Sequence, residues 1–192
     1  MIKIKNFLLM CLLPIFVCSC ENDLDKAYYF IGDSIIARWP LDETLPSQLV
    51  HNYGKSGAGI DYLNDFSGQF FNKDVVVMIG TNDIRMLDNE VIDSYADTYM
   101  QTISSLTDKK IYLFSILPRQ FNNDNADINE KISLLNSKIK GLLSNYPKVV
   151  YIDVYDEFID GEHINYQYYS DGLHLNAYGY EILSYYLLKT TS

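Results

Sequence analysis

Five apolar runs alternate with helix-like segments along this chain, and that alternation restricts its possible folds more than any other feature. The clearest run is Asp74–Ile79, which is apolar without interruption after its first residue, as in a strand covered on both faces. The other four runs lie at about 27–31, 48–53, 110–116 and 148–154. Strands that alternate with helices form a parallel sheet with helices on both faces. We therefore expect a single α/β domain.

Helical patterns fill the segments between the later runs. Apolar side chains recur at helical spacing from Ile92 to Leu106 and from Ile128 to Leu142. Asp127 precedes the second of these patterns, and Asn176 precedes a last helix expected at about 177–189. Both residue types commonly cap helices, so we expect a helix to begin after each of them.

The first twenty residues have the pattern of a targeting segment rather than of a folded element. Lys3 and Lys5 precede an apolar stretch, Phe7–Val17, that is too short to span a bilayer. It ends in Val17-Cys18-Ser19-Cys20, which resembles a bacterial lipobox in which Cys20 would receive a diacylglycerol. We therefore expect a lipoprotein signal peptide at 1–19, a polar tether at 20–26 and a folded domain at 27–192.

This interpretation predicts an exported protein held on a membrane through a lipid at Cys20, on the periplasmic or cell-surface side. Stable anchoring needs two or more acyl chains. The alternative is an ordinary secretory signal cleaved near Ser19. All three cysteines lie within the first twenty residues, so the folded domain can form neither an internal disulfide nor a thiolate metal site.

Size and charge narrow the classes of function. With 192 residues the chain is long enough for one well-buried domain. It has 25 acidic residues against 15 lysines and arginines, which gives a formal net charge of −10 and a pI near 4.6. Its three arginines, Arg38, Arg85 and Arg119, are scattered. A chain this acidic is repelled by phosphate backbones and anionic lipids, so we expect no nucleic-acid partner.

A serine follows the first apolar run directly. The run leads into Gly32-Asp33-Ser34, so Ser34 is expected at the carboxyl end of the first strand, where open α/β sheets bind ligands. A serine hydroxyl needs a base to become a nucleophile. His174 is a candidate base, and Asp171, three residues earlier, can orient its ring. We therefore predict a catalytic triad of Ser34, His174 and Asp171.

Three hydrogen-bond donors are candidates for an oxyanion hole. They are the Ser34 N–H, the Gly54 N–H after the second strand and the Asn82 side-chain amide after the third. Each motif alone has a plain structural explanation: Gly-Asp-Ser is a common turn, Asp-x-x-His a surface ion pair, and the other two suit turns or caps. Their joint occurrence in this order, each after a strand or in the last loop, favours catalysis.

Four blocks of the sequence resemble the SGNH (GDSL-type) hydrolases. They are Gly32-Asp33-Ser34, Asn52-Tyr53-Gly54-Lys55-Ser56-Gly57, Gly80-Thr81-Asn82-Asp83 and Asp171-Gly172-Leu173-His174. The resemblance implies a flavodoxin-like, three-layer α/β/α sandwich with five parallel strands in the order 2-1-3-4-5. It also implies ester hydrolysis through an acyl-enzyme on Ser34, without a metal or other cofactor, and it places Ser34, Gly54 and Asn82 in the oxyanion hole.

Two further stretches indicate which branch of the family this chain resembles most. Residues 31–35 and Ile116-Leu117-Pro118-Arg119 are most similar to platelet-activating-factor acetylhydrolase subunits and bacterial carbohydrate O-acetylesterases. This resemblance, the expected export and the lack of a long apolar lid segment favour a small acyl group, acetyl above all, on a carbohydrate. The alternatives are a lipase, lysophospholipase or thioesterase of the same family, and a non-catalytic glycan-binding lipoprotein.

Other residues are candidates for contact with the substrate. Aromatic side chains crowd an expected irregular stretch at 155–170. The candidates are Tyr166, Tyr168 and Tyr169 in this stretch, with Asp33 and Trp39 near the nucleophile. The alternative is that the rings cover the core, where aromatic side chains contribute most to packing. No group of His, Asp and Glu residues has the spacing of a metal site, so none is expected.

Overall fold

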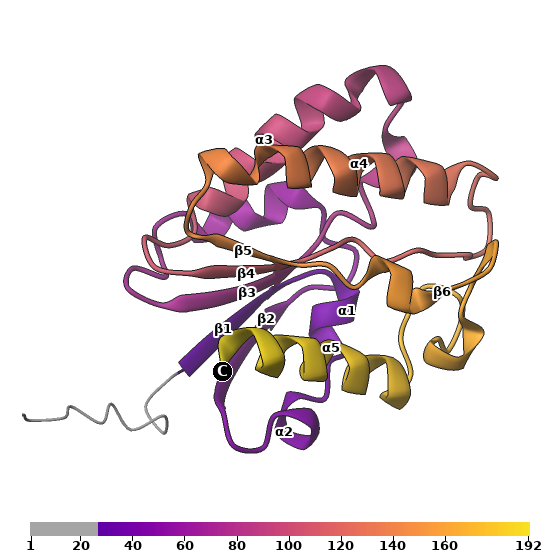
Figure 1. The fold of residues 1–192 in the computed structure, drawn as a ribbon. Helices are drawn as coiled ribbons and strands as arrows, with labels where there is room; N and C mark the ends of the chain where they lie inside the picture. Colours follow the sequence, from indigo (N-terminus) through magenta and orange to yellow (C-terminus); the bar gives the residue numbers. More distant parts are fainter. Residues whose placement is uncertain (1–26) are drawn as a thin grey trace, which may run out of the picture.

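The computed structural model describes residues 27–192, which fold around one five-stranded sheet (Figure 1). All neighbouring strands are parallel, and the order β2-β1-β3-β4-β5 confirms the predicted topology. The strands are β1 (Ala27–Gly32), β2 (Leu49–Gly54), β3 (Asp74–Met78), β4 (Ile111–Phe114) and β5 (Val149–Ile152). The expected signal peptide, Cys20 and the tether lie outside the described residues.

Helices cover both faces of the sheet and complete the three-layer sandwich. The helices α3 (Ile92–Ser104) and α4 (Ile128–Leu142) lie on one face, and α1 (Ser34–Ala37) and α5 (Ala177–Thr191) lie on the other (Figure 1). The shorter elements are α2 (Leu41–Thr44), η2 (Ile60–Phe66), η3 (Ile84–Met86), η4 (Asn89–Val91), η5 (Leu143–Asn145), η6 (Tyr155–Phe158), β6 (Ile159–Asp160), β7 (His163–Ile164) and η7 (Tyr166–Tyr168). The stretch predicted to be irregular therefore holds two short helical turns and a small hairpin.

The central strands are apolar along their length because both of their faces are buried. In β3, Val75 and Val77 pack into the core beneath α3 and α4. Val76 and Met78 pack into the opposite core, beneath α1 and α5. Burial of a side chain of this size stabilises the fold by about 1.5–3 kcal/mol. The uninterrupted apolar run therefore predicts both the strand and its central place in the sheet.

Two strands end earlier than their apolar runs predict. β4 ends at Phe114 rather than 116, and β5 ends at Ile152 rather than 154. Beyond these ends, the Ser115 hydroxyl accepts a hydrogen bond from the Val154 N–H at 3.0 Å. A side chain therefore replaces the regular backbone ladder there, and hydrophobic periodicity carries no sign of such a contact.

The two predicted helix starts are correct, although only one uses a side-chain cap. Asn176 caps α5, because its Oδ1 accepts a hydrogen bond from the Gly179 N–H at 3.2 Å. Asp127 immediately precedes α4, but its carboxylate forms an ion pair with Lys131 instead of capping the helix. Within residues 27–192, no helix has the length and apolar character needed to cross a bilayer.

The carboxyl ends of the first three strands lie level at one edge of the sheet. Gly32 at the end of β1 is paired in register with Gly54 at the end of β2 and with Met78 at the end of β3. The segments that follow these strands therefore begin side by side, at the edge where open α/β sheets bind ligands.

Candidate active site

Ser34 lies at the start of α1, directly after the carboxyl end of β1. Asp33 caps this helix, because its Oδ1 accepts a hydrogen bond from the Ile35 N–H at 2.9 Å. Gly32 leaves no room for a side chain, since a Cβ there would collide with the carbonyl oxygen of Met78 on β3. The turn is thus held from both sides and places Ser34 at the predicted edge of the sheet.

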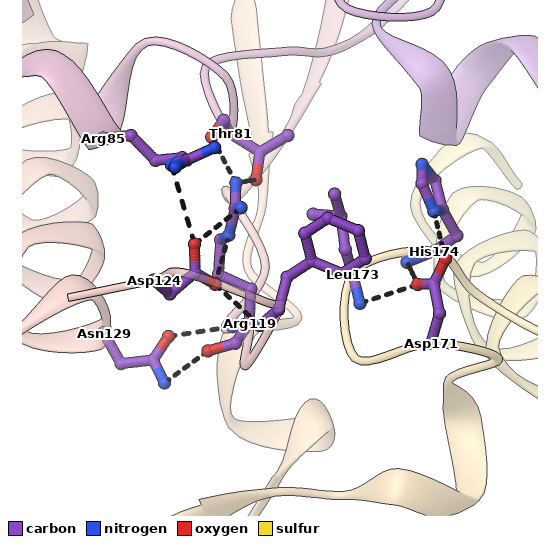
Figure 2. Close-up of polar contacts among 9 residues, drawn as sticks. Thr81, Arg85, Arg119, Asp124, Asn129, Asp171, Leu173 and His174 are labelled. Carbon is purple, nitrogen blue, oxygen red and sulfur yellow. Dashed lines mark hydrogen bonds and ion pairs between the residues drawn. The ribbon is translucent and has the colours of Figure 1, made fainter. Parts of the chain in front are cut away.

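His174 lies between this serine and a carboxylate, although 140 positions separate it from Ser34 in the chain. Its Nε2 is 3.1 Å from Ser34 Oγ, and its Nδ1 is 2.6 Å from Asp171 Oδ2. The other carboxylate oxygen of Asp171 accepts hydrogen bonds from the backbone N–H groups of Leu173 and His174, at 3.0 and 2.7 Å (Figure 2). The structure therefore brings the three residues of the predicted triad together in one hydrogen-bonded chain.

These contacts keep the Asp171 carboxylate ionised. Burial raises its pKa, but hydrogen bonds from the His174 side chain and from the backbone of His174 and Leu173 outweigh burial, so the pKa lies below its usual value. An ionised Asp171 accepts a hydrogen bond from the Nδ1–H of His174 and keeps the proton on that nitrogen, which leaves Nε2 able to accept the hydroxyl proton of Ser34. The arrangement can therefore activate the serine.

Two of the expected oxyanion donors have amide hydrogens available. Within residues 27–192, the Ser34 N–H at the first position of α1 has no hydrogen-bond acceptor. The Asn82 side-chain amide follows β3 and donates one hydrogen bond to the Ala58 carbonyl oxygen at 2.8 Å. Its second amide hydrogen has no acceptor in the described part of the chain.

The third expected donor, Gly54, needs correction. Its N–H already donates to Asn52 Oδ1 at 2.8 Å, and a Cβ at this position would collide with the Ala37 backbone of α1. Gly54 is therefore a glycine because β2 and α1 pack closely there. Gly57, three residues later in the segment that follows β2, has φ of +77° and open space on the Cβ side. Within the described chain its N–H has no acceptor, so it is a better candidate donor, which glycine spacing alone does not single out.

The structure also corrects the expected substrate contacts of Trp39 and Tyr169. Trp39 is 3% exposed and packs in the core beneath α5, where its ring N–H donates to Thr44 and Ser184. Tyr169 is buried too, and its hydroxyl donates to the Pro118 carbonyl oxygen at 2.6 Å. The aromatic rings at these two positions fill the core, where each removes a large apolar surface from water.

The other two tyrosines of the stretch lie nearer the surface. Tyr168 is partly buried and contacts the ring of Phe158 edge-on, with 5.5 Å between the ring centroids. Tyr166 is 57% exposed. Neither ring has a recorded contact with Ser34 or His174 among the described residues, so their role as substrate contacts stays a prediction.

Asp33 faces the interior rather than the substrate. Its side chain is fully buried, and its Oδ2 has no hydrogen-bond partner among the described residues. Burial is the main reason that the pKa of Asp33 rises to about 7; nearby Asp83 raises it further, whereas the Ile35 N–H and Arg119 lower it. Asp33 therefore shapes the serine turn from inside, which corrects its expected substrate contact.

The segment after β4 contributes residues that the sequence analysis missed. The ring of Phe121 contacts the His174 ring edge-on, with centroids 6.2 Å apart and an interplanar angle of 79°. The Gln120 N–H donates to the carbonyl oxygen of Gly172 at 2.8 Å, so this segment touches the turn that carries the base. The only sequence feature near Gln120 and Phe121 is the adjoining stretch 116–119. That stretch resembles one branch of the family but does not indicate a contact with the turn that carries His174.

The two remaining histidines have other environments. His51 stacks on Tyr29, with ring centroids 4.7 Å apart. His163 lies opposite Asp160 in the antiparallel register of the β6–β7 hairpin. Across residues 27–192, no group of three or more His, Cys, Asp or Glu side chains is placed to hold a metal ion.

Comparison with known proteins places the chain in a family. The model of the GDSL-like Lipase/Acylhydrolase family matches residues 30–182. No curated protein matches the chain. A solved structure described as a platelet activating factor of Streptococcus pneumoniae is 27% identical, with a TM-score of 0.70, and the match covers 90% of this chain and 87% of that chain.

Two further solved structures share the fold at lower identity. A GDSL-like lipase from Bacteroides thetaiotaomicron is 22% identical, with a TM-score of 0.65 and coverage of 85% of this chain and 86% of that chain. A catalytic mutant of an acetylxylan esterase from Geobacillus stearothermophilus is 18% identical, with a TM-score of 0.62 and coverage of 86% and 94%. The family model spans most of the described residues and includes Ser34, Asn82, Asp171 and His174. This chain therefore belongs to the GDSL-like lipase/acylhydrolase family of SGNH hydrolases and is a carboxylic ester hydrolase.

Proposed function

We propose that this protein is a serine esterase that removes small acyl groups, acetyl above all, from a carbohydrate. The observation that carries the proposal is the position of His174, within hydrogen-bond distance of both Ser34 Oγ and the Asp171 carboxylate. A serine, a base and an orienting acid in this order of contact form the arrangement that acyl transfer requires.

In the proposed reaction, Ser34 Oγ attacks the ester carbonyl carbon and its proton passes to His174 Nε2. Asp171 stays ionised and stabilises the imidazolium that forms. The bond between the carbonyl carbon and the alcohol oxygen then breaks, and His174 gives its proton to the leaving alcohol. Water, activated by His174 in the same way, hydrolyses the acyl-enzyme and releases the free acid and Ser34.

The negative oxygen of the tetrahedral intermediate would be held by the Ser34 N–H, the Asn82 amide and the Gly57 N–H. The hydrogen bond from Asn82 to Ala58 supports the choice of Gly57, because it fixes the loop next to Gly57 against Asn82. Each donor of this kind contributes roughly 10²–10³ in rate.

Two observations support a small acyl group on a carbohydrate. Between residues 27 and 192, the segments that follow β2, β3, β4 and β5 contain at most short helical turns and one two-stranded hairpin before the next long element, so none of them contributes an inserted helix that could serve as a lid. An acetylxylan esterase is among the solved structures that share the fold. A lipase, lysophospholipase or thioesterase would need a site that holds a longer acyl chain.

The test is hydrolysis of p-nitrophenyl acetate, butyrate and octanoate, together with release of acetate from acetylated xylo-oligosaccharides. We expect activity on acetate that falls with chain length and drops by about 10⁴–10⁶ in Ser34→Ala. Ser137→Ala, at an exposed position on α4, is the matched control and should behave as wild type. A rise toward octanoate favours a lipase or thioesterase, and no Ser34-dependent hydrolysis by folded protein favours a glycan-binding lipoprotein.

We also propose that the protein is exported and anchored to a membrane through a lipid on Cys20, with residues 1–19 removed. The proposal rests on the order Lys3, Lys5, apolar stretch and Val17-Cys18-Ser19-Cys20. The test is incorporation of labelled fatty acid by the full chain in a bacterial host. We expect label in wild type and none in Cys20→Ala; label in both proteins, or in neither, contradicts the anchor.

A further inference from the structure

Arg119 has one of the largest side chains buried in this protein, with 2% of it exposed. Its guanidinium donates to both carboxylate oxygens of Asp124, from Nε at 2.9 Å and from Nη2 at 2.8 Å (Figure 2). It also donates from Nη1 to the carbonyl oxygen and the hydroxyl of Thr81, at 2.7 and 3.2 Å. The desolvation of a buried ion pair offsets much of its attraction, so stability alone does not account for this arrangement.

The hydrogen bond from Arg119 to the Thr81 carbonyl oxygen links Arg119 to the proposed oxyanion hole through a single peptide group. The carbonyl of Thr81 and the N–H of Asn82 belong to the same planar peptide group. An arginine that fixes this carbonyl therefore fixes the plane from which the Asn82 side chain extends. Asn82 itself is held on its other side by its hydrogen bond to Ala58.

The backbone around Arg119 is itself held firmly. Asn129 on α4 accepts a hydrogen bond from the Arg119 N–H at 2.8 Å and donates to the Arg119 carbonyl oxygen at 2.9 Å (Figure 2). The Phe121 N–H donates to Asp124 Oδ2 at 2.7 Å. The guanidinium is thus presented to Thr81 from a loop with little freedom to shift.

The same loop contacts the other half of the site. Gln120 donates to the Gly172 carbonyl oxygen, and Phe121 contacts the His174 ring. Residues 119–124 therefore lie between the turn that carries Asn82 and the turn that carries His174. Figure 2 shows Arg119, Asp124 and Thr81 on one side of the view and Asp171, Leu173 and His174 on the other.

We propose that Arg119 is a positioning residue of the active site, whose guanidinium holds the Thr81–Asn82 peptide group so that the Asn82 amide points at the oxyanion. The inference rests on the proposed esterase function and adds a residue to it. A displacement of about 1 Å in a catalytic group can lower the rate about 10²-fold, so a loss of this anchor is measurable.

The test is a double-mutant cycle on p-nitrophenyl acetate hydrolysis with Arg119→Lys and Asn82→Ala. Lysine keeps the positive charge beside Asp124 but cannot donate to Asp124 and Thr81 together in the arginine geometry. We expect Arg119→Lys to lower kcat about 10- to 50-fold with KM changed less than about threefold. In the Asn82→Ala background the same substitution should change kcat less than about threefold, because the group that it positions is gone.

Arg85→Lys is the matched control. Arg85 approaches the same Asp124 at 3.8 Å from the solvent side, with 45% of its side chain exposed, and has no recorded hydrogen bond to Thr81 among the described residues. It should leave kcat within about twofold of wild type in both backgrounds. Thermal unfolding of every variant checks that each is folded at the assay temperature.

Equal losses of kcat with and without Asn82 would overturn the positioning role, as would an unchanged kcat or an effect on KM alone. If Arg119→Lys does not fold, Asp124→Asn replaces it in the cycle with the same criteria, because it loosens the guanidinium without removing it. Hydrolysis by wild type that depends on Ser34, combined with additive losses, overturns only the role of Arg119. No Ser34-dependent hydrolysis by wild type overturns the proposed function and this inference together.

Discussion

At the scale of single residues, Asp33 has the most unusual electrostatic environment of the site. Its folded pKa of about 7 lies above the ordinary value of 3.8 for an aspartate, chiefly because the carboxyl is buried. Between these two values the folded chain keeps a proton that the unfolded chain releases. The stability contributed by protonated Asp33 is therefore fully present below pH 3.8 and is lost as the pH rises to about 7.

Asp33→Asn should remove this dependence, because the amide oxygen still accepts from the Ile35 N–H and no charge has to be buried. We expect the variant to gain stability relative to wild type between pH 4 and 7, by up to about 4 kcal/mol, and no further above pH 8. Urea unfolding at each pH measures this difference. Asp42→Asn, an exposed position in α2, is the control. A difference for Asp33→Asn that is constant over the whole range would contradict the assignment.

Asn82→Ala tests the oxyanion hole at the same scale. Loss of its amide should lower kcat roughly 10²–10³-fold with little change in KM, because the donor acts on charge that develops only in the transition state. Steady-state hydrolysis of p-nitrophenyl acetate gives both constants. Asn64→Ala, at an exposed position in η2, should have no effect on either constant. A rise in KM alone would instead make Asn82 a group that binds the ground state.

At the scale of elements, the turn that carries Asp171 and His174 is constrained more tightly than an ordinary loop. Gly172 has φ of +83°, and a Cβ there would collide with the Gln120 carbonyl oxygen. Gly161, in the turn between β6 and β7, has φ of +62°, but a Cβ there would meet open space. An alanine at Gly161 therefore tests the cost of the left-handed backbone alone, whereas an alanine at Gly172 tests that cost together with a collision against Gln120.

Gly161→Ala should cost about 1 kcal/mol of unfolding free energy, from the left-handed backbone alone, and leave kcat unchanged. Gly172→Ala adds the collision, so it should cost more stability and lower kcat at least about tenfold by shifting His174 from Ser34. Urea unfolding and acetate-ester kinetics on both variants check these outcomes. Equal effects of the two substitutions would show that the contact with Gln120 does not hold the turn.

At the scale of the whole molecule, the site depends on two cores that hold the sheet between its helical layers. Leu113 on β4 is fully buried in one of them, whereas Leu134 on α4 is 38% exposed. Leu113→Ala should lower the free energy of unfolding by about 2–5 kcal/mol, and Leu134→Ala by less than about 1 kcal/mol. Denaturant unfolding measures both, and similar losses would contradict the position of Leu113 in the core.

Much of the architecture follows from the order of residue types along the chain. The apolar run 75–79 is that of a central strand, and the alternation of such runs with helical patterns leads to the parallel sheet. Ser34 and Asn82 lie in the turns that follow β1 and β3, so they reach the same edge of the sheet for the same topological reason. The meeting of Ser34 with His174 could be predicted because their roles need each other, although 140 positions separate them.

The amino-acid sequence by itself determined the fold class and the residues that could form a triad, because periodicity and local motifs carry that information. The strand order followed from the resemblance of its motifs to those of the SGNH hydrolases. The tertiary structure alone decided how neighbouring candidates divide their roles. Gly54 packs against α1 while Gly57 stays open, and Trp39 and Tyr169 turn into the core. Arg119 becomes a buried anchor for Thr81. Each of these outcomes depends on contacts between distant segments, and a side chain's burial and hydrogen-bond partners exist only once those segments have packed.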